Sequence, residues 1–133
     1  MARILVIDDD PTIRSLCTLA LTNSGHEVAT APDGRDGLAL LGRRRFDLVV
    51  TDLVMPDQEG IATIRSIRDL AHDLPILAIS GSLGSEVRGG VDYLKLAISL
   101  GAQAGLRKPF SPRQLSKAVE ELLAGGPMPP APP

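Results

Sequence analysis

The chain contains a single cysteine, Cys17, among its 133 residues. One cysteine cannot form an internal disulfide, so we expect the protein to work in the reducing cytoplasm. The formal net charge of −2 gives no reason to expect direct contact with nucleic acid or with a membrane surface. The apolar run after Arg3 is too short for a signal peptide, and no run approaches the length of a transmembrane helix.

What the chain does have is a series of short aliphatic segments. Residues 4–7, 48–50 and 76–79 do not alternate with polar residues, which is typical of parallel strands buried on both faces. Residues 27–31 and 104–107 are weaker strand candidates. The length and the 44% content of hydrophobic residues fit one compact domain with a proper core.

Helical patterns lie between these strands. Apolar residues recur in five segments at the spacing of one helix face. The residues that mark these segments are Ile13, Leu16, Cys17, Ala20 and Leu21; Leu38 and Leu41; Ile61, Ile64 and Ile67; Leu94, Ala97 and Ile98; and Leu115, Val119, Leu122 and Leu123. Pro11 suits the start of the first helix, Gly25 suits its end, and Ser111 is expected to cap the fifth. Strands that alternate with helices predict an α/β fold with a doubly wound parallel sheet.

The last nine residues differ in composition from the rest of the chain. Residues 1–124 carry the strand and helix patterns and are expected to form one domain. The last nine residues, GGPMPPAPP, are rich in proline and cannot continue a helix. They predict a disordered tail over residues 125–133.

Polar side chains gather at the predicted carboxyl ends of the strands. Asp8 and Asp9 follow the first strand, Asp52 ends the third, Ser80 ends the fourth and Lys108 ends the fifth. Ligands of an open parallel sheet bind beyond these ends, at the point where the strand order reverses. With the order 2-1-3-4-5, the first and third strands are neighbours, so we expect their carboxylates to converge.

Three neighbouring carboxylates repel one another unless one takes a proton or a cation joins them. Mg²⁺ fits because carboxylates, waters and phosphate oxygens are its usual ligands, and Lys108 would be a fixed second cation. Metal, lysine and hydroxyl around one carboxylate form a phosphoryl-transfer site, with the central Asp52 as candidate nucleophile. For Asp10, before Pro11, we favour a role as helix cap, and capping and stabilising the first turn is the alternative for all of residues 8–10.

At this point the motifs resemble a known family. "DDD" after the first strand, "DLVMPDQEG" after the third, "ISG" after the fourth and "KPF" after the fifth resemble the receiver domain of bacterial two-component response regulators. The resemblance covers about residues 3–124. It implies a flavodoxin-like fold with five strands in the order 2-1-3-4-5 and five helices, and a domain that labels itself rather than a multiple-turnover enzyme.

The resemblance implies a role for each acidic residue. Asp52 would accept a phosphoryl group from a sensor histidine kinase or a histidine phosphotransfer protein. Asp9 would bind Mg²⁺ directly and Asp8 through water. Asp52 and the backbone carbonyl of Val54 would complete the set of protein ligands.

The same resemblance assigns the remaining motif residues. Ser80 would be the switch hydroxyl that moves toward the phosphoryl group, and Lys108 would pair with a phosphoryl oxygen. The residues expected to frame the site are Met55, Pro56, Gly60 and Pro109, of which Pro109 follows a bond that is often cis in the family.

The sequence departs from the family pattern in places. Gly105 stands where the family usually has a large residue that rotates with the switch hydroxyl, so the output mechanism cannot be copied across. Residues 81–96 lengthen the connection between the fourth and fifth strands and contain several glycines, which suggests a mobile loop. The resemblance also implies that the residues two places after the phosphoacceptor and two places after the switch hydroxyl flank the path of the hydrolytic water. Here these residues are Val54 and Ser82, and neither is suited to orient a water, so a long-lived phosphorylated form is expected.

Two other functions remain open. "LVIDDDPT" also fits the signature of haloacid-dehalogenase-type phosphatases, with Asp8 as nucleophile and Asp10 as general acid, although this leaves Asp52 unexplained. A receiver-like interaction module that never gains a phosphoryl group is the second alternative. If these residues are the whole protein, a receiver of this length would act on a downstream protein by contact or by passing its phosphoryl group onward.

Overall fold

The computed structural model of the protein describes residues 1–53, 59–80, 87–88 and 91–125. Five parallel strands form one sheet in the order β2-β1-β3-β4-β7. The strands are β1 (Arg3–Ile7), β2 (Glu27–Ala31), β3 (Leu48–Asp52), β4 (Ile76–Ser80) and β7 (Ala104–Arg107). Because β7 is the fifth strand of this sheet along the chain, the predicted order 2-1-3-4-5 is confirmed.

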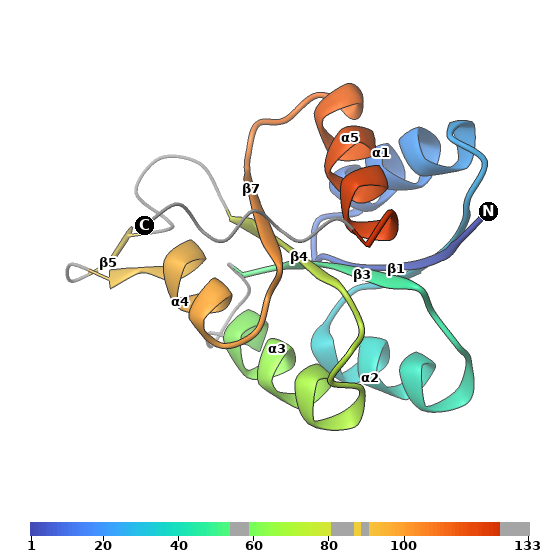
Figure 1. Ribbon diagram of the computed structural model, residues 1–133. Coiled ribbons are helices and arrows are strands. Elements are labelled where there is room, and N and C mark those ends of the chain that lie inside the picture. Colours follow the sequence, from blue (N-terminus) through green and yellow to red (C-terminus); the bar gives the residue numbers. More distant parts are fainter. Residues whose placement is uncertain (54–58, 81–86, 89–90, 126–133) are drawn as a thin grey trace.

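Five helices cover the two faces of the sheet. They are α1 (Pro11–Asn23), α2 (Gly34–Arg43), α3 (Glu59–Leu70), α4 (Tyr93–Ser99) and α5 (Pro112–Leu123). Helices α1 and α5 lie on one face, and α2, α3 and α4 lie on the other (Figure 1). Among the described residues, no helix has the length and apolar character needed to cross a membrane.

Two hydrophobic clusters hold the layers together. On one face, Leu5, Val49 and Ile76 of the sheet pack with Ile64 and Ile67 of α3. The opposite face uses the alternate residues of the same strands, which pack against α1 and α5. Side chains of successive strand residues point to opposite faces, so a strand covered on both sides must be apolar throughout. This is why the central strands read as unbroken aliphatic runs in the sequence.

The helix ends follow the sequence signals. The side chain of Asp10 accepts a hydrogen bond of 2.9 Å from the N–H of Thr12 and caps α1. Ser111 and Gln114 form a reciprocal capping box at the start of α5. Gly25 follows α1 with φ of 92°, a left-handed conformation that glycine adopts without strain.

Strand β3 ends at Asp52 as predicted, and it extends beyond its apolar run because Thr51 and Asp52 pair with β4 although their side chains are polar. One detail of the structure differs from the sequence predictions. Within the connection expected to be a loop, β5 (Val87–Arg88) and β6 (Val91–Asp92) form a small antiparallel pair. Two-residue strands are too short to produce a readable periodicity, so the sequence pattern missed them.

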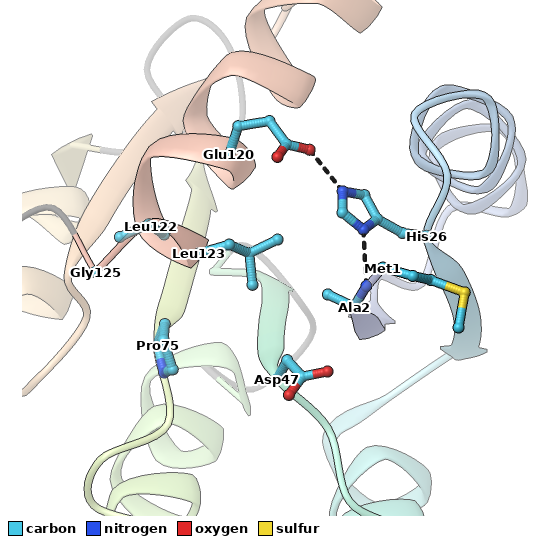
Figure 2. A pocket seen from close by; sticks show the side chains of 9 residues that line it. All are labelled: Met1, Ala2, His26, Asp47, Pro75, Glu120, Leu122, Leu123 and Gly125. Atoms are coloured by element: carbon cyan, nitrogen blue, oxygen red, sulfur yellow. Dashed lines mark hydrogen bonds and ion pairs between the residues drawn. The ribbon is translucent and has the colours of Figure 1, made fainter.

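The amino ends of the strands form the edge of the sheet opposite Asp52. A pocket of about 500 Å³ opens there, lined by Ala2, His26, Asp47 and Pro75 from the starts of four strands and by the end of α5. Figure 2 shows His26 joining two elements across this pocket. Its Nδ1 accepts a hydrogen bond of 3.1 Å from the N–H of Ala2, and its Nε2 lies 2.6 Å from Oε2 of Glu120. His26 thereby links the start of the sheet to α5.

Candidate functional site

Three carboxylates meet at the carboxyl edge of the sheet. Oxygen atoms of Asp8, Asp9 and Asp52 all lie within 4.8 Å of one another. The register explains the meeting, because Ile7 of β1 is paired with Thr51 of β3, and Asp8 and Asp52 are the next residues of each strand. Asp8 and Asp52 are buried, whereas Asp9 is exposed on the turn that leads to α1.

Lys108, the first residue after β7, extends its side chain to this cluster. Its Nζ lies 3.3 Å from Oδ2 of Asp8 and 3.5 Å from Oδ2 of Asp52. The backbone N–H of Lys108 donates a 2.9 Å hydrogen bond to the carbonyl of Ser80, which anchors the lysine to the neighbouring strand. One ammonium group therefore pairs with two buried carboxylates from β1 and β3.

Burial and charge act on the pKa values of the site in opposite directions. Burial raises the pKa of Asp8, and the N–H of Asp10 and the ammonium of Lys108 only partly oppose this effect. Burial lowers the pKa of Lys108, but attraction to Asp52 and then to Asp8 outweighs it, so the pKa of Lys108 is raised. Lys108 is therefore a permanent cation in the site.

The donor atoms fit a hard divalent cation. Oγ of Ser80 is a buried side-chain oxygen without a hydrogen-bond partner among the described residues, and the buried Oδ2 of Asp8 has no hydrogen bond there beyond its ion pair with Lys108. A buried polar atom is normally satisfied, so these oxygens beside two further carboxylates suit a cation or an oxygen-rich ligand. Carboxylate oxygens are the ligands that Mg²⁺ prefers. Asp8, Asp9 and Asp52 are thus the residues that would hold a magnesium ion.

Gly60 stands against the strand that carries Asp52. A Cβ atom at Gly60 would lie 2.5 Å from the carbonyl oxygen of Asp52, 2.5 Å from Cα of Leu53 and 2.6 Å from its carbonyl oxygen. Only glycine allows the start of α3 to approach the end of β3 this closely. The expected framing role of Gly60 therefore has a steric basis.

The other predicted site residues have different outcomes. Ser80 is buried and is the last residue of β4. It directly follows Ile79, which is paired with Asp52 of β3. The Lys108–Pro109 bond is cis. Gly105 is half-buried in β7 and is paired with Ala78. Four predicted residues lie outside the described ranges: Val54, Met55, Pro56 and Ser82.

Sequence reasoning missed one contact at this site. Nη1 of Arg14, in the first turns of α1, donates a 2.7 Å hydrogen bond to the backbone carbonyl of Asp8. Arg14 lies six residues after Asp8, which precedes the helix, so helical spacing gives no signal for this contact. No residue-type pattern predicts that its side chain turns back to a backbone oxygen.

The geometry defines a class of protein: a flavodoxin-like doubly wound domain with an acidic, oxygen-lined site at the carboxyl edge of its sheet. The sequence model described as "Response regulator receiver domain" matches residues 4–120. The chain belongs to this family, whose members are signalling domains. This membership does not favour the phosphatase alternative, and Asp10, its expected general acid, caps α1 instead.

Relatives by sequence are response regulators and transcriptional regulators. "Response regulator MprA" of Mycolicibacterium vanbaalenii is 38% identical over 122 residues, covering 92% of this chain and 47% of that protein. "Transcriptional regulatory protein AfsQ1" of Streptomyces coelicolor is 35% identical over 126 residues, covering 95% of this chain and 53% of that protein. The chain spans about half the length of the curated relatives it matches.

Solved structures show the same fold. The chemotaxis response regulator CheY4 of Vibrio cholerae has a TM-score of 0.79 at 31% identity, covering 92% of this chain and 98% of that chain. NtrX of Brucella abortus has a TM-score of 0.84 at 32% identity, covering 93% of this chain and 27% of that chain. The similarity thus includes a chain of nearly equal length and a part of a much longer one.

Proposed function

We propose that this domain accepts a phosphoryl group on Asp52 and transmits the change through protein contacts. An Asp52 carboxylate oxygen attacks the phosphorus of a phosphohistidine or a small acyl phosphate. The new P–O bond forms an aspartyl phosphate, while the bond to the donor breaks and the donor keeps that electron pair. Charge on the transferring oxygens requires fixed positive groups, and positioning supplies most of the remaining catalysis.

The observation that carries this proposal is the placement of Lys108 against two buried carboxylates. Its Nζ lies 3.5 Å from Oδ2 of Asp52, close enough to pair with an oxygen of a phosphoryl group on that residue. When bound by Asp8, Asp9 and Asp52, Mg²⁺ supplies a second positive charge against the phosphoryl oxygens. The hydroxyl of Ser80, which has no hydrogen-bond partner among the described residues, is the group that would bind an oxygen of the phosphorylated aspartate.

Several finer assignments belong to the same proposal. The phosphoryl donor is a sensor histidine kinase or a histidine phosphotransfer protein, and the partner downstream is another protein. The domain spans residues 1–124 with a proline-rich tail from residue 125, and it works in the cytoplasm. Val54, through its carbonyl, joins the metal ligands, and Val54 and Ser82 allow slow hydrolysis. The domain labels itself once and does not turn over substrate.

The test is labelling of the purified chain by acetyl phosphate, followed by intact mass spectrometry. We expect one phosphoryl group to be added in Mg²⁺ and none in excess EDTA. Asp52→Asn should abolish labelling, whereas Asp69→Asn, a change at an exposed residue of α3, should leave it intact. Undiminished labelling of Asp52→Asn would contradict the proposal, and loss only in Asp8→Asn would favour the phosphatase alternative.

A turnover assay separates the remaining alternative outcomes. A self-labelling receiver releases little phosphate from excess phosphate ester, whereas a phosphatase releases many equivalents per chain. A pure interaction module gives neither labelling nor turnover.

The proposed slow hydrolysis of the phosphorylated form is tested by comparing the decay of the labelled protein with that of labelled Val54→Asn and Ser82→Glu. At least one of these variants should lose its phosphoryl group faster.

A further inference from the structure

Besides the ion pair of its carboxylate with Lys108, three hydrogen bonds hold Asp8 in place. Its N–H donates a 3.1 Å hydrogen bond to the carbonyl of Ala31 in β2, and its Oδ1 accepts a 2.9 Å bond from the N–H of Asp10. The third contact is the 2.7 Å bond from Nη1 of Arg14 to its backbone carbonyl. The first two bonds come from neighbouring backbone groups and Lys108 contacts the carboxylate, whereas Arg14 is the side chain that binds the backbone carbonyl of Asp8.

The carbonyl of Asp8 is part of the peptide group that joins it to Asp9. A peptide group is planar, so fixing this oxygen also fixes the plane in which the N–H and Cα of Asp9 lie. Asp9 is exposed on a turn, whereas the carboxylates of Asp8 and Asp52 are buried. The direction in which the Asp9 carboxylate leaves the chain therefore depends on how this peptide group is oriented.

We propose that Arg14 is a positioning residue of the metal site, which orients the Asp8–Asp9 peptide group so that Asp9 faces Asp8 and Asp52. This inference rests on the proposed function, because it concerns the same acidic site. Arg14 is half-buried and its guanidinium is a planar donor with a fixed geometry, which suits a hold on one carbonyl oxygen. Outer partners that orient metal ligands typically change metal affinity by about 10- to 100-fold when they are removed.

Arg14 also brings a positive charge to the backbone carbonyl of Asp8, beside the acidic site, and this effect has the opposite sign. A cation near the site repels Mg²⁺, so a residue acting only through charge would raise the metal affinity when it is removed. A residue acting through position would lower that affinity when it is removed. The direction of the change thus separates the two roles.

The experiment measures Mg²⁺ binding by isothermal titration calorimetry on the full chain and on three variants. Arg14→Met removes the donor and the charge but keeps the length of the side chain, and Arg14→Lys keeps the charge and one possible donor. Arg35→Met is the matched control, because Arg35 is an exposed arginine near the start of α2. Circular dichroism at the titration temperature checks that each variant is folded.

We expect Arg14→Met to weaken Mg²⁺ binding about tenfold, Arg14→Lys to weaken it less, and Arg35→Met to leave it unchanged. The Mg²⁺ concentration that half-saturates labelling by acetyl phosphate should shift in the same order. Equal or tighter binding by folded Arg14→Met overturns the inference while labelling of the unmodified chain still stands. Absence of both Mg²⁺ binding and labelling in the unmodified chain overturns the inference together with the proposed function.

Discussion

Replacing Gly60 by alanine places one methyl group between α3 and the strand that carries Asp52. The new Cβ would lie 2.5 Å from the carbonyl oxygen of Asp52 and from Cα of Leu53. Both atoms belong to the backbone of a buried segment, so neither can move aside as the end of a flexible side chain can. Helix α3 must therefore shift away from β3, or β3 must be distorted.

The expected cost follows from two opposing effects. Overpacking of a tight interior typically costs about 1–3 kcal/mol, and contact with backbone on this scale belongs at the upper end. Alanine is preferred over glycine inside a helix by up to about 1 kcal/mol. We therefore expect Gly60→Ala to lower the free energy of unfolding by about 2 kcal/mol, the difference between these values.

Gly42→Ala is the matched control within the same chain. Gly42 lies near the end of α2, is exposed, and a Cβ there meets nothing within 4 Å. The same substitution should then raise the free energy of unfolding by about 0.5 kcal/mol through helix propensity alone.

Urea unfolding followed by far-ultraviolet circular dichroism measures both changes, since the chain has no tryptophan to report by fluorescence. Labelling of Asp52 by acetyl phosphate should also slow in Gly60→Ala, because the displaced backbone carries the phosphoacceptor. A Gly60→Ala variant as stable as Gly42→Ala would refute the steric argument.

Two further predictions concern the half-buried Arg68 and the buried Cys17, which lie outside the site. Arg68→Met should lower the free energy of unfolding by about 2 kcal/mol, because the Arg68 guanidinium donates hydrogen bonds to three backbone carbonyls and to Oε1 of Gln103. Arg65→Met, at an exposed position of α3, is the control, and it should change the free energy of unfolding little in the same urea assay. Burial raises the pKa of the Cys17 thiol to about 12, so Ellman's reagent should label Cys17 only after unfolding, and rapid labelling of the native protein would contradict this. The thiol of the unfolded chain ionises near pH 8.5, so above that pH the unfolded state binds fewer protons than the folded state, and the contribution of Cys17 to stability should fall as pH rises from about 9 to 12.

Much of the fold could be predicted from local sequence patterns. The runs at residues 4–7 and 76–79 marked β1 and β4 because a strand covered by helices on both faces excludes polar residues. Capping residues gave helix ends, as at Asp10 and Ser111, because side chains that satisfy the first N–H groups act over two or three residues. Patterns failed at β5 and β6, since strands of two residues are too short to show a period.

Some features of the site could likewise be predicted from local sequence patterns, whereas others depend on contacts between residues far apart in the sequence. That Asp8, Asp52 and Lys108 end strands was readable, and the parallel order of those strands placed them at one edge of the sheet. The steric need for glycine at position 60 and the contact of Arg14 with the Asp8 carbonyl were not readable, since neither follows from residue type or period.

The sequence by itself determined the five strands of the main sheet, the five helices and the residues at the carboxyl edge, and its family resemblance implied the order of the strands. Only the tertiary structure decided that one ammonium, that of Lys108, contacts both Asp8 and Asp52 and that α3 approaches β3 too closely for any side chain at Gly60. The physical reason is range: hydrophobic period and capping act between residues a few positions apart, whereas these contacts join residues made neighbours by the packing of whole elements.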